Sequence, residues 1–120
     1  MTIRVVLADD HPLTRAGLSA YLQQENSIEL VGEAEDGEKA WELIVDLKPD
    51  VALLDIRMPG EDGVSIARRI KEEKLPVIPV MLTSYDAHQY VVASLRAGAR
   101  GFILKTSTPQ DLIRAIQTVV

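Results

Sequence analysis

The sequence predicts an α/β fold, a parallel five-stranded sheet covered by helices on both faces. Short apolar, β-branched runs alternate with longer segments of helical periodicity along the 120 residues. The two central runs, Val51–Leu54 and Val77–Leu82, are apolar on both faces, as strands of a fully covered parallel sheet are. Five strands and five helices joined by right-handed crossovers favour a flavodoxin-like, doubly wound (βα)5 three-layer sandwich with strand order 2-1-3-4-5.

Five short runs carry the strand signal. Each is rich in valine, isoleucine and leucine, residues that suit a pleated and buried surface. None approaches the roughly 18 apolar residues that a membrane span needs. The expected strands are Ile3–Ala8, Ile28–Ala34, Val51–Leu54, Val77–Leu82 and Gly101–Leu104.

Five helices are expected between and after these strands. Pro12, Asp62 and Pro109 are typical of helix starts, and Gly98 is typical of a helix end. Apolar residues recur at helical spacing in every segment. They are Leu18 and Leu22; Ala40, Ile44 and Leu47; Ile66 and Ile70; Val91, Val92, Leu95 and Ala97; and Leu112, Ile113, Ile116 and Val119.

The composition describes one acidic globular domain. Apolar residues make up 47% and charged residues 26%, and 13 basic against 18 acidic side chains give a net charge of −5. At roughly 150 residues per domain, residues 1–120 form a single domain. An acidic domain repels phosphate, so it should bind nucleic acid and anionic membranes poorly by itself. The absence of cysteine excludes disulfides, thiolate metal sites and a cysteine nucleophile.

The ends of the chain favour a cytoplasmic segment of a longer protein. The first apolar run is cut off at once by Asp9 and Asp10, so it is too short for the core of a signal peptide. The chain stops at Val119 and Val120, within an apolar helical pattern.

Polar side chains follow the expected strands at the point where each strand ends. Because the carboxyl ends of parallel strands meet at one edge, these groups should converge there. Glu35 and Asp36 follow the second strand, which lies at the outer edge of the sheet in the expected order. The groups that should gather are Asp9, Asp10, Asp55, Thr83, Ser84 and Lys105.

Three neighbouring carboxylates need a cation or a proton. Two like charges about 4 Å apart repel by about 4 kcal/mol at an effective dielectric constant near 20. Carboxylate oxygens favour Mg²⁺, which binds one or two carboxylates together with phosphate oxygens. A lysine and a hydroxyl around a carboxylate nucleophile would suit an aspartyl phosphate. Single acidic pairs at strand ends also cap helices, but coincidence does not explain all four strand ends together.

These residues resemble those of the bacterial response-regulator receiver domain over essentially the whole chain, from about Ile3 to Val120. Asp9 and Asp10 match the acidic pair of that family, and residues 55–63 resemble its phosphoacceptor loop. The stretch 9–18 further resembles the subgroup whose receiver precedes a LuxR-type helix-turn-helix domain. DNA would then be bound only through that domain, which is absent from this sequence.

The resemblance implies a role for each matched residue. Asp55 would accept a phosphoryl group from the phosphohistidine of a sensor histidine kinase. Mg²⁺ would be bound by Asp10, Asp55 and the backbone carbonyl of Arg57, with Asp9 acting through a water molecule.

The same resemblance implies a conformational switch. Lys105 would contact the phosphoryl group, Thr83 would move toward it, and Phe102 would change rotamer. The domain would thus be a regulatory phosphoacceptor rather than an enzyme, with at most weak self-phosphatase activity. It would control an output such as transcription and form a homodimer on phosphorylation, with Arg96 and Arg100 either on the dimer face or as ordinary surface charges.

Three other functions are open alternatives. A Mg²⁺-dependent phosphohydrolase that forms an aspartyl phosphate usually has a second carboxylate two residues after the nucleophile, where this chain has Arg57. A flavin carrier of similar fold should lack Asp9 and Asp10, which would repel a flavin phosphate. A degenerate receiver that serves only as a dimerisation module should lack an acid, the lysine or the hydroxyl, and none is missing.

Several residues near the expected site have individual interpretations. Thr106 stands where many relatives have a cis-proline, and a cis bond without proline costs about 3–4 kcal/mol. Arg57 and Tyr85 are bulky enough to shield a phosphoryl group from water. His11 is interpreted as an exposed residue at a helix start rather than as a metal ligand, and His88 as solvated.

Overall fold

The computed structural model describes residues 2–84 and 88–120, and five strands alternate with five helices along the chain. In chain order the elements are β1 (Ile3–Ala8), α1 (Pro12–Gln24), β2 (Ile28–Ala34), α2 (Gly37–Leu47), β3 (Val51–Asp55), α3 (Gly63–Glu72), β4 (Ile78–Thr83), α4 (His88–Arg96), β5 (Gly101–Leu104) and α5 (Pro109–Val119).

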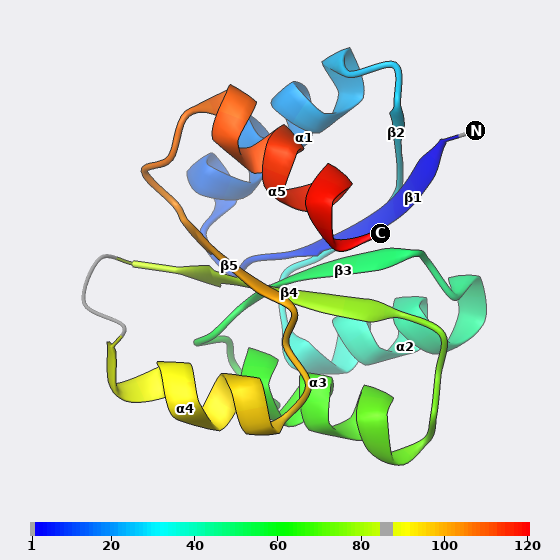
Figure 1. Ribbon diagram of the computed structural model, residues 1–120, viewed down its shortest axis with the longest axis vertical. Helices are drawn as coiled ribbons and strands as arrows, with labels where there is room; N and C mark the ends of the chain where they lie inside the picture. The colour runs from blue at the N-terminus through cyan, green and yellow to red at the C-terminus, as the bar shows by residue number, and fades with distance from the viewer. Residues whose placement is uncertain (1, 85–87) are drawn as a thin grey trace.

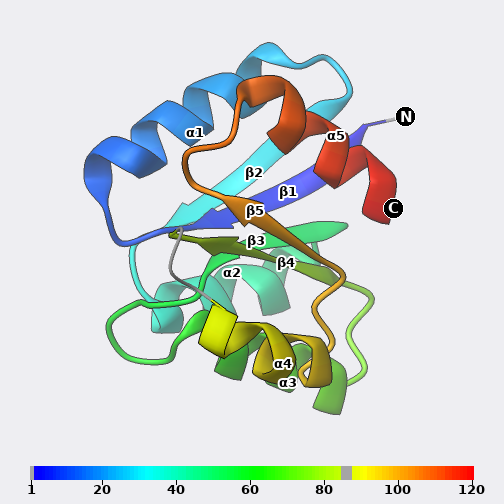
Figure 2. The same cartoon turned by 60° about the vertical axis from the view of Figure 1, so that its left-hand side comes forward.

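The strands form one parallel sheet in the order β2-β1-β3-β4-β5, which confirms the predicted topology. Helices α1 and α5 cover one face of the sheet, and α2, α3 and α4 cover the other (Figures 1 and 2). The strand boundaries differ slightly from prediction. β3 extends to Asp55, and β4 begins at Ile78 and ends at Thr83. Asp55 and Thr83 therefore belong to the ends of strands, where the backbone is fixed by pairing.

The sheet separates two apolar cores. Leu53 faces the core under α1 and α5, while the next residue, Leu54, faces the core over α2, α3 and α4. Both side chains are fully buried. This alternation is the reason that the central strands are apolar at every position, because both faces of a doubly wound sheet are covered.

Side-chain caps fix the starts of three helices. Asp36 accepts a hydrogen bond from the Lys39 N–H, Asp62 from the Ser65 N–H at 2.8 Å, and Thr108 from the Asp111 N–H. Each cap satisfies a backbone donor that a helix terminus otherwise leaves free. The acidic residue Asp36 therefore caps α2.

The loop from β3 to α3 packs closely against its neighbours. A Cβ atom at Gly63 would overlap the backbone carbonyl of Asp55, and one at Gly37 would overlap the carbonyl of Glu61. The Gly37 N–H also donates to the Pro59 carbonyl at 3.2 Å. The two glycines thus let the loop that follows Asp55 lie directly against α2 and the end of β3.

None of the helices in the described part of the chain is long and apolar enough to span a membrane.

Candidate functional site

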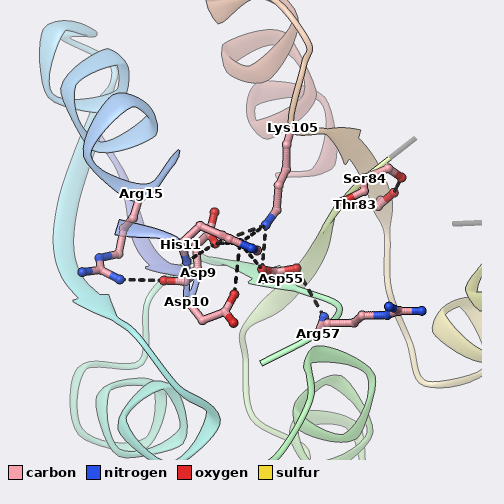
Figure 3. Close-up of polar contacts among 9 residues, drawn as sticks. All are labelled: Asp9, Asp10, His11, Arg15, Asp55, Arg57, Thr83, Ser84 and Lys105. Atoms are coloured by element: carbon pink, nitrogen blue, oxygen red, sulfur yellow. Dashed lines mark hydrogen bonds and ion pairs between the residues drawn. The ribbon is translucent and has the colours of Figure 1, made fainter. Parts of the chain in front are cut away.

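The polar groups predicted to converge do so at the carboxyl edge of the sheet (Figure 3). Asp55 ends β3, Asp9 and Asp10 directly follow β1, and Lys105 directly follows β5. The Lys105 Nζ atom lies 2.7 Å from Asp55 Oδ2 and 3.2 Å from Asp9 Oδ1. One ammonium group therefore bridges carboxylates from two adjacent strands, as the predicted strand order requires.

Two of these carboxylates are buried. Asp9 is fully buried, and Asp55 is 4% exposed. Among the described residues, Asp9 Oδ2 and Asp10 Oδ1 are buried without a hydrogen-bond partner. A buried charged oxygen without a partner is costly, and a single lysine cannot satisfy three carboxylates. The cluster therefore has unfilled capacity for a cation.

Burial raises the pKa of Asp55 from 3.8 to about 6. The hydrogen bond and charge of Lys105 oppose this rise, and the neighbouring charge of Asp9 adds to it. Burial by itself lowers the pKa of Lys105, but the hydrogen bond and charge of Asp55, together with Asp9, outweigh burial and raise it above its usual value. Asp55 is consequently a carboxylate paired with an ammonium group at neutral pH.

The geometry of the acidic cluster suits a divalent ion. Asp9, Asp10, His11 and Asp55 each offer one ligand atom, and these atoms all lie within 4.8 Å of one another. Ligands that share an ion at about 2.1 Å are separated by no more than about 4.2 Å, so a small adjustment would bring them around one ion. Hard carboxylate oxygens, two of them without partners, match the ligand preference of Mg²⁺.

The cluster forms one wall of a pocket of about 410 Å³. The pocket is lined by Asp10, His11, Asp55, Ile56, Arg57, Thr83, Ser84, Tyr90 and Lys105. The backbone N–H of Arg57 donates to Asp55 Oδ1 at 3.3 Å, which helps to orient the carboxylate. Tyr90 was not identified from the sequence, because its position on α4 depends on how that helix packs across the sheet.

Thr83 is among the residues that line the pocket, whereas Phe102 is not. Thr83 is buried and lines the pocket, and its hydroxyl donates to the backbone carbonyl of Ser84 (Figure 3). Phe102 is half-buried and packs against the core over α2, α3 and α4. In this structure the Thr83 hydroxyl is therefore bonded to its own loop.

His11 is exposed, as predicted, yet its ring is not directed away from the site. Its side chain is 64% exposed, and its Nδ1 atom lies 3.2 Å from Asp10 Oδ1 and 3.3 Å from Asp9 Oδ1. Arg15 stabilises the same loop from the other side, because its Nη1 donates to the Asp9 carbonyl at 2.7 Å. The loop after β1 is thus fixed by Arg15 of α1, which binds the Asp9 carbonyl, and by the Asp9 carboxylate, which accepts from the His11 N–H.

The remaining predicted residues lie away from this cluster or outside the described residues. Arg96 and Arg100 are exposed, at the end of α4 and before β5. The described residues contain no cis peptide bond, so the bond between Lys105 and Thr106 is trans. Tyr85 lies outside the described residues, as does the side chain of His88.

Comparisons with known proteins agree with this geometry. The sequence model of the response regulator receiver domain matches residues 5–117. The transcriptional regulatory protein NarL of Mycobacterium tuberculosis is 44% identical over 114 residues, covering 95% of this chain and 53% of that protein. The oxygen regulatory protein NreC of Staphylococcus aureus is 38% identical over 118 residues, covering 98% of this chain and 54% of NreC. The chain thus spans about half the length of these curated relatives.

Solved structures show the same fold. The signal receiver domain of M. tuberculosis NarL superposes with a TM-score of 0.94 at 42% identity, covering 98% of this chain and 95% of that one. The isolated receiver domain of RcsB from Salmonella enterica serovar Typhimurium, solved with the phosphomimetic BeF₃⁻, gives a TM-score of 0.88 at 29% identity and covers 99% and 88%. With its matched sequence, its strand order and an acidic pocket that fits a phosphoacceptor site, the chain belongs to the response regulator receiver domain family.

Proposed function

We propose that residues 1–120 form one receiver domain in which Asp55 accepts a phosphoryl group from a sensor histidine kinase. The contact between Lys105 Nζ and Asp55 Oδ2, at 2.7 Å, carries this proposal. This contact supports the proposal because it pairs a cation that could bind a phosphoryl group with the carboxylate that ends the buried strand β3. Response regulators are substrates of histidine kinases, so the chain takes the regulatory role of its family rather than that of an enzyme.

The proposed phosphoryl transfer requires Asp55 to be ionised and Lys105 to be protonated. Above pH ~6 Asp55 is a carboxylate, and one of its oxygens attacks the phosphorus of the phosphohistidine. The P–N bond breaks, its electron pair stays on the imidazole of the kinase, and an acyl phosphate forms on Asp55. Lys105 stays protonated and donates to the transferred group, so part of the added negative charge is neutralised.

The donors at this edge fit Mg²⁺, because two buried carboxylate oxygens lack partners and all ligand atoms lie close together. Asp10, Asp55 and the backbone carbonyl of Arg57 would hold the ion directly, and Asp9 would hold it through a water molecule. When bound, Mg²⁺ supplies positive charge that offsets the repulsion between these carboxylates and an incoming phosphate.

Thr83 and Phe102 supply the proposed switch. The Thr83 hydroxyl would leave the Ser84 carbonyl and donate to a phosphoryl oxygen, and Phe102 would change rotamer in the space near Thr83. A phosphoryl group adds up to about two negative charges and three acceptor oxygens. Moving a two-state equilibrium from 1:99 to 99:1 needs about 5.5 kcal/mol, which a few charge-assisted hydrogen bonds of roughly 1.5–3 kcal/mol each would supply.

The output of this switch lies outside the domain. NarL of M. tuberculosis is a transcriptional regulatory protein of about twice the aligned length. By analogy, the receiver would control transcription through a separate DNA-binding domain and would form a homodimer when phosphorylated. Its own chemistry would extend no further than slow hydrolysis of the acyl phosphate.

Phosphorylation with a small donor tests the proposal. Acetyl phosphate and Mg²⁺ should add the mass of one phosphoryl group to the wild-type domain and to Asp46→Asn, which removes an exposed carboxylate on α2. Asp55→Asn should remain unlabelled. Equal labelling of Asp55→Asn would exclude Asp55 as the acceptor, and size-exclusion chromatography of the same samples would report dimer formation.

A further inference from the structure

We propose that His11 is a ligand of this metal site. The ratio of Mn²⁺ affinity to Mg²⁺ affinity should therefore be higher here than at a site made of oxygen donors alone, and the same should hold for related first-row transition ions. The inference rests on the proposed function only for the location of the ion. The imidazole changes the donor atoms of the site from oxygen alone to oxygen and nitrogen. Imidazole nitrogen suits transition ions, whereas carboxylate, carbonyl and water suit Mg²⁺.

The first support is the position of the imidazole. His11 Nδ1 lies 3.2 Å from Asp10 Oδ1, 3.3 Å from Asp9 Oδ1 and 3.8 Å from Asp55 Oδ2. The separations from Asp10 Oδ1 and Asp55 Oδ2, the two carboxylates proposed to hold the ion directly, are those expected between ligands that share one ion, about 3–4 Å for bonds near 2.1 Å. A side chain that is 64% exposed could project into solvent, but this ring turns its Nδ1 atom toward all three carboxylates.

The second support is the backbone that holds the ring in place. The His11 N–H donates to Asp9 Oδ1 at 2.9 Å, so residue 11 is tied to the first acid of the cluster. His11 is the N-cap residue of α1, and its side chain caps no N–H of the helix. Pro12 follows at the first helical position and fixes the direction in which the chain enters α1. The imidazole is thus positioned near the acids without a role in the helix.

The third support is the unsatisfied capacity of the acids. Asp9 is fully buried, and its Oδ2 atom, like Asp10 Oδ1, has no hydrogen-bond partner among the described residues. Lys105 Nζ, which can only donate, lies 3.1 Å from His11 Nδ1. In the tautomer that accepts this hydrogen bond, the Nδ1 lone pair points into the cluster, where a metal ion would replace the ammonium group as its partner.

The consequence is a difference in metal selectivity that depends on one residue. Removal of the imidazole should weaken Mn²⁺ binding about tenfold, a loss within the range seen when groups that support metal ligands are removed. Mg²⁺ binding should change by less than about threefold, because Mg²⁺ keeps water in the position that the nitrogen would take.

Pulsed electron paramagnetic resonance with Mn²⁺ alone tests this directly, because a coordinated imidazole adds ¹⁴N modulation to the spin echo of the ion. We expect this modulation in the wild-type domain and in His88→Ala, which removes the only other histidine of the chain. It should be absent in His11→Ala and His11→Gln. Calorimetric titration with Mn²⁺ and Mg²⁺ gives the affinity ratio, and circular dichroism verifies that each variant is folded.

The outcomes separate this inference from the proposed function. Persistent ¹⁴N modulation in both His11 variants, or an unchanged ratio of Mn²⁺ to Mg²⁺ affinity, would overturn the inference even if acetyl phosphate still labels Asp55. Loss of modulation in the His11 variants would support it even if Asp55 fails to be labelled, in which case only the phosphoacceptor assignment would be withdrawn.

Discussion

Arg57 donates two hydrogen bonds to the hydroxyl of Tyr90, from Nη2 at 2.8 Å and from Nε at 3.1 Å. Arg57 belongs to the loop after β3, and Tyr90 belongs to α4. The contact therefore joins two residues that are 33 positions apart in the sequence. Both side chains line the pocket that contains Asp55.

The first prediction concerns this contact. If Arg57 shields a phosphoryl group on Asp55, Arg57→Ala should speed phosphate release by roughly three- to tenfold, about 1 kcal/mol of barrier. Tyr90→Phe removes only the hydroxyl that holds Arg57, so its effect should be smaller and in the same direction. Phosphate release after labelling with acetyl phosphate measures both, with the exposed Arg68→Ala as control. An unchanged rate in Arg57→Ala would remove the shielding role.

The second prediction follows from the pKa of Asp55, which burial raises to about 6. The folded state binds this proton more tightly than the unfolded state, so ionisation of Asp55 lowers the free energy of unfolding. This penalty is absent below the unfolded pKa of 3.8, grows as pH rises, and is complete above about 6. Without metal, Asp55→Asn should therefore be more stable than wild type above pH ~7, by about 1–3 kcal/mol.

Urea unfolding in chelator across this pH range measures the difference between Asp55→Asn and wild type. The stabilisation should decrease as pH falls from 6 towards 3.8, because the wild-type carboxyl then takes up its proton. A variant that is no more stable than wild type at neutral pH would contradict the assigned cost of burying this charge.

The third prediction concerns the opposite change, Lys105→Met. Lys105 Nζ forms ion pairs with both Asp55 and the fully buried Asp9, and its side chain is only 12% exposed. Its removal leaves buried acids without their cation, which should destabilise the domain by about 3 kcal/mol in chelator. Mg²⁺ should restore part of the loss, since it would supply positive charge at the same carboxylates. Lys39→Met, at an exposed lysine of α2, is the control in the same unfolding experiment.

Equal destabilisation of Lys105→Met with and without Mg²⁺ would contradict the view that the ion and the ammonium group compensate the same charges.

The fourth prediction concerns the support of the loop after β3. The Arg69 guanidinium lies 4.0 Å from the centre of the Trp41 ring, and its Nη1 lies 2.7 Å from Glu61 Oε1. Arg69→Met keeps most of the side-chain volume but removes the charge, and it should destabilise the domain by about 1 kcal/mol. Because Trp41 is the only tryptophan, its fluorescence should also change. Arg68→Met should leave both unchanged, and an unaltered Trp41 emission in Arg69→Met would show that the stacking is unimportant.

The sequence was sufficient to predict where the polar groups converge. Strand ends are marked by abrupt changes from apolar to charged residues, and parallel strands bring those ends to one edge. The strand order was predicted separately, from the doubly wound architecture that alternating strands and helices favour, and with it these two facts account for the positions of Asp9, Asp55 and Lys105.

The orientation of side chains could not be predicted in the same way. The contact between Arg57 and Tyr90 depends on the distance between a loop and α4, which no local pattern encodes. The direction of the His11 ring and the bond from the Thr83 hydroxyl to Ser84 depend on rotamers chosen among several staggered positions by the finished packing. Residue types indicated the chemistry of the site, whereas its detailed contacts depend on the packing of the folded domain.

The close approach at Gly63 has a consequence for which mutations should abolish signalling. Any side chain there would press on the backbone of Asp55 and displace its carboxylate relative to Lys105. A genetic screen for loss of signalling should therefore recover changes at position 63 alongside those at Asp55, even though glycine contributes no reactive group. If Asp55 is the phosphoacceptor, silence of the pathway in such mutants would reflect a misplaced carboxylate rather than a missing one.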